Sequence, residues 1–314
     1  MTRVGGAAAA RISAMLLVVG SIAFDAVKTP FGAVERAQGG SAVYFAVAAS
    51  LFTEVAVVGV VGDDFTAEDR KIFAGRRIQT DGIVTRPGKT FHWRGEYGFD
   101  LNSAKTLDTQ LGVFGDFDPV IPEALRAPEY LFLANIHPLL QLKVLEQVKR
   151  PKLVALDTMN FWISSAREAL MKVIERVDLV VLNDAETREL AGEPNLYKAA
   201  RIIRSWGPKR LVVKRGEYGA LLFDGDHLFA LPAYPLESTF DPTGAGDSFA
   251  GGLIGHLAES GTLASNELRA AMAYGSVVAS FTVEDFSLGK LGIVTRDEVE
   301  ARHKQFLRLT RFEG

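Results

Sequence analysis

Short apolar runs alternate with segments of helical pattern along most of this chain. One run, Met15–Ala23, is interrupted by Gly20, and a second, Val55–Val61, consists mainly of valine. Between them, Ser41–Phe52 is too continuously apolar for a surface helix and indicates a buried helix. Buried strands that alternate with helices are typical of α/β folds with a mostly parallel sheet. We expect this chain to fold in that way.

The alternation continues toward the C-terminal end. A helix is expected at Phe65–Ala74, whereas Ser21–Pro30 is interpreted as a loop or a short extended piece that carries Asp25. Later strands are expected at Tyr130–Ala134, Leu153–Leu156, Leu179–Leu182, Leu211–Lys214 and Ala220–Phe223. Later helices are expected at Leu139–Lys149, Ala166–Arg176, Asp184–Ala191, Leu196–Trp206 and Asn266–Thr282.

The N-terminal residues 1–14 are rich in glycine and alanine and are expected to form a flexible leader. Arg3 and Arg11 ahead of the first apolar run superficially resemble a signal peptide, but that run is short and charges follow at once. No stretch approaches the roughly 18 apolar residues that a membrane span needs. No linker rich in proline, glycine or serine divides the remainder, so we expect residues 15–314 to form a single domain.

The composition limits the partners and the chemistry. The chain has 314 residues, 48% of them hydrophobic and 23% charged, with a formal net charge of −3. The net charge shows no excess of basic residues that would favour binding to nucleic acid or to an anionic membrane. The absence of cysteine from the sequence excludes disulfides, thiolate zinc sites and cysteine nucleophiles. We expect a cytoplasmic protein that acts on a small molecule.

A segment at about residues 83–113 breaks the alternation. Thr90–Tyr97 alternates aromatic or apolar residues with polar ones, as a half-exposed strand does, and Thr106–Val113 is a candidate partner strand. We interpret this segment as a small β insertion that projects from the main sheet and forms a lid.

The segment Asp241–Gly252, with the sequence DPTGAGDSFAGG, predicts a turn that enters a helix. Its residues Gly244, Ala245 and Gly246 carry almost no side chain, so that backbone amides and the helix dipole form an anion site. Asp247 beside that site is suited to take a proton from a hydroxyl. A purely structural reading, in which the carboxylates only cap and turn, explains the glycine pair poorly. The turn therefore favours phosphoryl transfer to an alcohol.

Polar residues also follow several predicted strands. Asp25 follows the first strand, while Asp157–Asn160 and Asn183–Glu186 follow two later ones. Open α/β sheets bind ligands where parallel strands end. Each of these residues alone is more often a helix cap. Their joint occurrence with the glycine turn favours a binding site.

Other functional signatures are missing from the sequence. It has no P-loop and no Gly-x-Gly-x-x-Gly motif after the first strand. The triplet at residues 246–248 is not a hydrolase elbow, because position 250 is alanine instead of the final glycine. The five histidines include no His-x-x-x-His pair, which argues against zinc.

Four motifs together resemble one enzyme family. The turn Asp241–Asp247 resembles the C-terminal signature of the ribokinase/PfkB carbohydrate kinases, and Gly39-Gly40 resembles their N-terminal glycine pair. Gly59–Phe65 resembles the strand and turn that follow that pair, and Asn183-x-x-Glu186 resembles the metal and phosphate motif. The resemblance covers about residues 15–306. It implies a ribokinase-like three-layer α/β/α fold with a small β lid, and transfer of the γ-phosphoryl of ATP to a sugar-like hydroxyl.

The resemblance also implies roles for individual residues. Asp247 is expected to be the general base, and the amides of Gly244, Ala245, Gly246 and Asp247 are expected to form the anion hole. The acceptor is expected to contact Asp25, Gly39, Gly40, Tyr44 and Asn160.

On the nucleotide side, the resemblance places Lys214, Gly216 and Gly219 along the phosphates. Asn183 and Glu186 are expected to orient Mg²⁺ through its waters. Tyr274 and Ser287 are expected to wall the adenine, and Asp241, opposite residues 283–287, to border a monovalent-cation loop for K⁺.

Two departures leave the acceptor open. Tyr44 stands where many family members have an asparagine that contacts the sugar, and Arg215 stands where they often have an apolar residue. Aromatic residues suited to a nucleoside base, or alternatively to lid and core packing, are Phe91, Trp93, Tyr97, Phe99, Phe161 and Trp162. A nucleoside kinase and a non-catalytic sugar or nucleotide sensor are the alternatives, and a homodimer through the lids is compatible with the resemblance.

Overall fold

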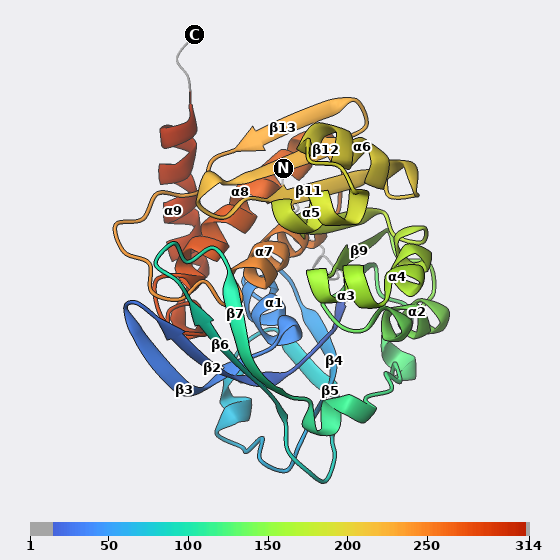
Figure 1. The fold of residues 1–314 in the computed structure, drawn as a ribbon, viewed down its shortest axis with the longest axis vertical. Helices are drawn as coiled ribbons and strands as arrows, with labels where there is room; N and C mark the ends of the chain where they lie inside the picture. The colour runs from blue at the N-terminus through green and yellow to red at the C-terminus, as the bar shows by residue number, and fades with distance from the viewer. Residues whose placement is uncertain (1–14, 312–314) are drawn as a thin grey trace, which may run out of the picture.

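Two β-sheets organise the chain in the computed structural model, which describes residues 15–311 (Figure 1). The predicted leader at residues 1–14 lies outside these described residues. The large sheet has nine strands, of which β12 runs antiparallel to β11 and to β13 while the others pair in parallel. Its strands in spatial order are β13 (His227–Leu231), β12 (Ala220–Asp224), β11 (Arg210–Lys214), β10 (Leu179–Asn183), β9 (Leu153–Asp157), β8 (Tyr130–Leu133), β1 (Leu16–Val19), β4 (Val55–Val61) and β5 (Ile78–Thr85).

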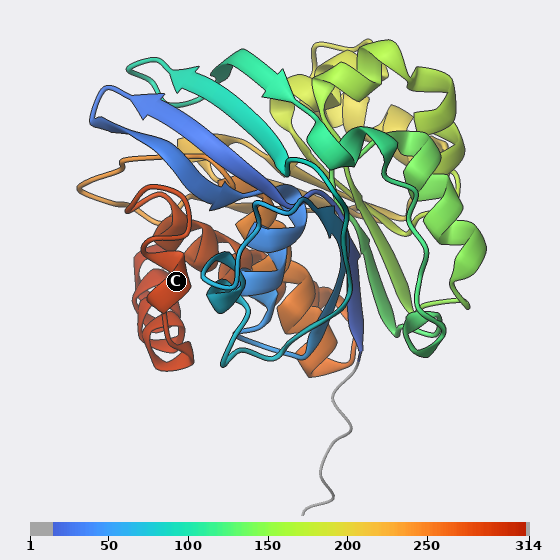
Figure 2. The same ribbon diagram turned by 90° about the horizontal axis from the view of Figure 1, so that it is seen from below.

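Helices cover both faces of the large sheet (Figure 2). One helical layer contains α1 (Ser41–Ala49), α7 (Ala245–Ser260), α8 (Ser265–Thr282) and α9 (Arg296–Thr310). The other contains α2 (Pro138–Gln147), α3 (Asn160–Ser165), α4 (Arg167–Ile174), α5 (Asp184–Ala191) and α6 (Leu196–Ser205). In β1, Leu16 and Val18 join the first core while Leu17 and Val19 join the second. This alternation explains why the strand is apolar throughout and confirms the predicted three-layer α/β/α fold.

A second sheet of four strands, which we call the lid sheet, projects from the first (Figures 1 and 2). Its strands in spatial order are β3 (Gly32–Gly39), β2 (Ala23–Thr29), β6 (Phe91–Tyr97) and β7 (Ala104–Gln110). The segment 83–113 therefore supplies only half of the lid sheet. Of the two interpretations of Ser21–Pro30, the extended one is correct, because most of this segment forms β2, which pairs with β6.

The expected helix at Phe65–Ala74 is wrong. Only a 3₁₀ turn, η1 (Asp69–Ile72), forms there. The Asp69 carboxylate accepts hydrogen bonds from the backbone amide and the hydroxyl of Thr66, both at 2.8 Å, and from Arg36 of the lid sheet. Side-chain bonds of this kind compete with helical backbone bonds. The remaining 3₁₀ helices are η2 (Gly112–Asp116), η3 (Glu123–Leu125), η4 (Gly216–Tyr218) and η5 (Leu291–Ile293).

Among residues 15–311, no helix is both long and apolar enough to cross a membrane.

Candidate active site

The glycine turn lies at the start of α7. Gly244 is the N-cap residue and has φ of 76°, a left-handed conformation that disfavours residues with a side chain. A methyl group at this position would also lie 2.3 Å from the Tyr44 ring of α1. Both the backbone and the packing therefore require glycine here, and Tyr44 contacts the turn directly.

The backbone amides of this turn are not equivalent. The Ala245 amide donates to the carbonyl oxygen of Pro242 at 3.1 Å and closes the turn. The Ala245 amide is thus already paired in this structure, and its predicted place in the anion hole stays a prediction. The amides of Gly244, Gly246 and Asp247 precede the first intrahelical bond of α7, in which the Ser248 amide donates to Gly244. Unpaired amides at a helix N-terminus, reinforced by the helix dipole, suit an anion.

Asp247 lies in the first turn of α7, within a cluster of charged side chains. Burial raises the pKa of its carboxyl group to about 8, and the neighbouring Asp157 and Asp25 add to the increase while Lys214 opposes it. A carboxylate with such a pKa is a stronger proton acceptor near neutral pH than an ordinary aspartate.

Lys214, the last residue of β11, supplies the cation of this cluster. Its Nζ atom lies 3.2 Å from Oδ2 of Asp157 at the end of β9. A methyl group at Gly246 would lie 2.8 Å from the same Nζ atom, so the ammonium group rests against the glycine turn. Burial opposes its charge, but Asp157, Glu186 and Asp247 together raise the Lys214 pKa. The lysine therefore stays charged beside the turn.

Asn183 and Glu186 form a reciprocal capping box at the start of α5. The Glu186 amide donates to Oδ1 of Asn183 at 2.7 Å, and Oε2 of Glu186 accepts from the Asn183 amide at 2.8 Å. Burial raises the Glu186 pKa to about 7, an effect that Lys214 opposes. These bonds show that Asn183 and Glu186 cap α5, as the structural alternative to a binding role predicts. Oε1 of Glu186 takes no part in the capping box.

The fit of this region to magnesium is limited to water-mediated contact. Residues 15–311 contain no group of three or more His, Cys, Asp or Glu side chains that could hold a metal ion. Mg²⁺ normally keeps several waters and binds through one or two carboxylates plus phosphate oxygens. Glu186, next to Asp157 and the start of α5, meets that requirement, so the predicted magnesium role of Asn183 and Glu186 stays a prediction.

Asp25 lies on β2 against the glycine pair. A methyl group at Gly39 would lie 1.8 Å from its Oδ2 atom, and Gly40 has φ of 96° with the carbonyl of Ser21 in contact. The pair is thus needed for the close approach of β2 to the start of α1. Burial and the nearby Asp241 raise the Asp25 pKa to about 7. A buried carboxylate in such a place is suited to accept hydrogen bonds from ligand hydroxyls.

Asp241 is fully buried and joins the turn to the segment after α8. Its Oδ1 accepts from the Thr243 amide at 2.9 Å, and its Oδ2 accepts from the Ser287 amide at 3.0 Å. Ser287 has φ of 54°, and its hydroxyl donates to the carbonyl of Gln38 in the lid sheet. These contacts tie Ser287 to Asp241 and to the lid sheet. The predicted adenine role of Ser287 stays a prediction. A monovalent cation beside Asp241 stays a prediction.

Tyr274 packs inside the layer formed by α7, α8 and α9. Its ring stacks on His303 at 3.9 Å and on His256 at 4.4 Å between ring centroids, and its hydroxyl donates to Glu300. Side chains of α7 and α9 thus cover the ring. The adenine role that the resemblance implies for Tyr274 stays a prediction.

The turn between β11 and β12 carries Gly216 and Gly219, both with positive φ. A methyl group at Gly219 would lie 2.0 Å from the carbonyl oxygen of Leu231, and one at Gly216 would lie 2.9 Å from Oδ1 of Asn102. Asn102 belongs to the β6–β7 connection. The lid sheet therefore reaches the predicted nucleotide side, a contact that the sequence did not indicate.

The six aromatic candidates lie in different surroundings. Phe91 stacks on Phe114 at 5.3 Å, and the Tyr97 hydroxyl accepts from the Thr243 hydroxyl at 3.2 Å. Phe161 and Trp162, at the start of α3, contact each other edge to face, and Phe99 is 86% exposed. Asn160 is exposed, and its Oδ1 accepts from the Phe161 amide. Trp93 lies on β6, directly beside Asp25 of β2.

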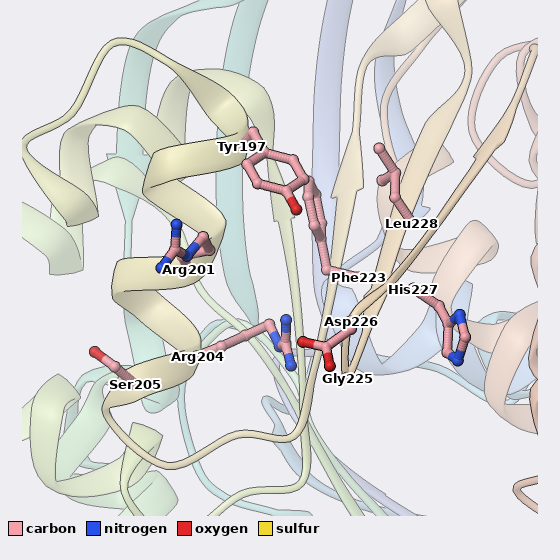
Figure 3. A pocket seen from close by; sticks show the side chains of 9 residues that line it. All are labelled: Tyr197, Arg201, Arg204, Ser205, Phe223, Gly225, Asp226, His227 and Leu228. Atoms are coloured by element: carbon pink, nitrogen blue, oxygen red, sulfur yellow. The ribbon is translucent and has the colours of Figure 1, made fainter.

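A cavity of about 410 Å³ lies outside this cluster, between α6 and the β12–β13 hairpin (Figure 3). Figure 3 shows Arg204 of α6 pointing across it toward Asp226 of the hairpin. None of the predicted site residues lines it; its lining residues are Tyr197, Arg201, Arg204, Ser205, Phe223, Gly225, Asp226, His227 and Leu228.

The charged cluster thus gathers at the carboxyl ends of β9, β10 and β11 and at the start of α7. In the paired register Asn183 of β10 is beside Lys214 of β11, and Val181 is beside Asp157 of β9. The sequence marked Asp157 as a strand-end residue without a role. Its pairing with Lys214 depends on the order of the strands, which the sequence did not provide.

Comparison with known proteins identifies the family. Residues 13–291 match the family model described as pfkB family carbohydrate kinase. The chain is 32% identical to a cytidine kinase of Thermococcus kodakarensis over 76% of this chain and 87% of the relative. Its fold is similar to that of a putative ribokinase II from E. coli (TM-score 0.77, 18% identity, 93% and 99% of the two chains). It is also similar to a Burkholderia thailandensis nucleoside kinase in complex with inosine (TM-score 0.73, 21% identity, 93% and 99%). The chain belongs to the pfkB family of carbohydrate kinases.

Proposed function

We propose that this kinase transfers the γ-phosphoryl group of ATP to a hydroxyl of a small sugar or sugar-like acceptor, with Asp247 as the general base. The observation that carries the proposal is the position of Asp247 in the first turn of α7, beside the amides of Gly244 and Gly246. A proton acceptor and an anion site next to each other are what an in-line attack by an alcohol requires.

In the proposed reaction, Asp247 takes the proton of the acceptor hydroxyl, and the oxygen atom of that hydroxyl attacks the γ-phosphorus atom of ATP. The bond from phosphorus to the bridging oxygen of ATP breaks, and ADP leaves. Charge on the transferred group faces the amides of Gly244, Gly246 and Asp247, with the Lys214 ammonium group beside the turn. Fixed donors of this kind stabilise a transition state without reorganising. Magnesium bound with the nucleotide would neutralise phosphate charge.

Asp25 is proposed to hold the acceptor. Its buried carboxyl group lies against the glycine pair, close enough to Asp247 for its charge to raise the Asp247 pKa. A hydroxyl-bearing acceptor bound by Asp25 would therefore lie within the same cluster as the base.

Two classes of small molecule are candidates for the phosphoryl acceptor. A free sugar fits the family description. A nucleoside is favoured by the relative named as a cytidine kinase, which this chain matches over 87% of its length. The fold neighbour that was solved with inosine supports the same class.

The first test is the Asp247→Asn variant in a coupled ADP-release assay with a panel of sugars and nucleosides. We expect kcat to fall by about 100-fold or more, since general-base catalysis contributes about 10²–10⁴-fold, while ATP binding survives. Near-normal turnover by the variant would contradict the mechanism. If ligands bind the wild type and none stimulates ADP release, the non-catalytic sensor is the better interpretation.

A further inference from the structure

The lid sheet has one face toward the charged cluster, and its other face packs on the main body at Phe24 and is exposed farther along the strands. Asp25 and Tyr97 lie on the first face, where Asp25 packs on Gly39 and Tyr97 bonds to Thr243. The other face carries Lys28, paired with Glu96 at 2.7 Å, and Arg94, whose side chain is 53% exposed. Because side chains alternate along a strand, residues 91, 93, 95 and 97 of β6 share the inward face.

Trp93 is the inward residue beside Asp25. The two are register partners in the parallel pair β2–β6, so their Cα atoms are on neighbouring strands roughly 4.8 Å apart. The Trp93 side chain is partly exposed. A ligand held by the Asp25 carboxylate would therefore have the indole ring as its next neighbour across the sheet.

The indole lies flat along the strand because position 95 is glycine. A methyl group on Gly95 would lie 2.1 Å from the six-membered ring of Trp93. The indole Nε1 donates to the hydroxyl of Thr106 on β7 at 3.2 Å, and Thr106 is the register partner of Gly95. The indole ring of Trp93 therefore extends over Gly95 toward β7, where its bond to Thr106 fixes its orientation. It forms a flat surface on the inward face of the lid sheet.

We infer that Trp93, lying flat on Gly95 beside Asp25, is the stacking platform for an uncharged heteroaromatic base, and that the acceptor class is therefore a nucleoside. The sugar hydroxyls would bind Asp25 and the base would lie on the indole. Stacking suits a base because every base has a π-face. This inference rests on the proposed function, whose acceptor it specifies.

The test measures cytidine affinity by isothermal titration and steady-state kinetics with cytidine and with D-ribose. Stacking of one base on an aromatic side chain corresponds to roughly 5- to 150-fold in affinity. We expect Trp93→Leu to raise the Kd and KM of cytidine within that range, with the KM of ATP and of ribose unchanged. Trp93→Phe should retain most of the affinity.

Two further variants separate stacking from folding. Gly95→Ala keeps the tryptophan but displaces its ring, so it should weaken cytidine binding as Trp93→Leu does. Phe99→Ala is the matched control, because Phe99 is an exposed aromatic residue of the same lid sheet, in the β6–β7 connection. Its cytidine affinity should equal that of the wild type.

Several outcomes would overturn the inference. Unchanged cytidine affinity in Trp93→Leu and Gly95→Ala would do so, as would equal losses for cytidine and ribose, or a wild type that prefers ribose. Those results would leave phosphoryl transfer intact. Cytidine binding that depends on Trp93 without any turnover would instead contradict the proposed reaction, since titration does not require catalysis.

Discussion

Gly244 and Gly261 close the two ends of α7 with the same left-handed backbone. Their φ values are 76° and 71°. Their surroundings differ, because the Tyr44 ring covers Gly244 whereas no atom lies within 4 Å of a methyl group at Gly261. The two positions therefore separate the cost of the backbone conformation from the cost of displacing the glycine turn.

We predict that Gly261→Ala destabilises the protein by about 1 kcal/mol and leaves kcat unchanged, because only the backbone cost of positive φ applies. Gly244→Ala should destabilise more and should reduce kcat by about 100-fold, since displacement of the turn by about 1 Å misplaces the anion site. Thermal unfolding and steady-state kinetics measure both effects. Equal kcat values for the two variants would contradict the assigned role of the turn.

At the scale of elements, the lid sheet is fixed to the main body at its base. Arg36 of β3 makes two bonds to the buried carboxylate of Asp69 at 3.1 Å, and its guanidinium group lies 3.7 Å over the Phe24 ring. Phe24 in turn stacks on Phe65 of the main body at 5.6 Å. These contacts join β2 and β3 of the lid sheet to the main body.

We predict that Arg36→Ala loosens the lid sheet by about 1–2 kcal/mol, because it leaves Asp69 without its charged partner. Amide hydrogen exchange should become faster in β2 and β3, where local opening is governed by these contacts. Arg94→Ala is the matched control. Its nearest carboxylate, on Glu35, is 3.9 Å away and both side chains are exposed, so little change is expected. Equal exchange rates in the two variants would exclude Arg36 as the anchor.

At the scale of the whole molecule, carboxylates with raised pKa values are concentrated at one edge of the sheet. Burial raises the pKa of Asp25 and of Glu186 to about 7 and that of Asp247 to about 8. A carboxyl group whose pKa is higher in the folded state contributes stability at low pH, and this contribution is lost as the pH rises from about 4 toward the folded pKa. The site therefore lowers the stability of the ligand-free protein at neutral pH.

We predict that Asp247→Asn is more stable than the wild type, and that the difference in stability grows as the pH rises from about 4 to 8. Only the wild type must ionise this buried group across that range. The difference in Tm should reach on the order of a few degrees at pH 8. A pH-independent difference in Tm would show that Asp247 ionises as easily in the folded state as in the unfolded chain.

The amino-acid sequence by itself determined the layered fold and the glycine turn that enters α7. Strands such as Val55–Val61 are buried on both faces and must be apolar throughout. The local sequence is therefore enough to identify them as buried strands. Gly244, Gly39 and Gly40 stand where neighbouring atoms leave no room for a side chain, which explains why the sequence has glycine at these marked positions.

Only the tertiary structure decided which distant residues meet. β2 joined the lid sheet because it pairs with β6, far along the chain, and a local pattern cannot specify a partner strand. The stacking of Tyr274 in α8 on His303 in α9 likewise joins two helices, and a local pattern does not specify that contact. The Asp157–Lys214 pair and the neighbours of Trp93 depend on strand order and register. Pairing between remote segments is a property of the whole fold, because it depends on how every layer packs.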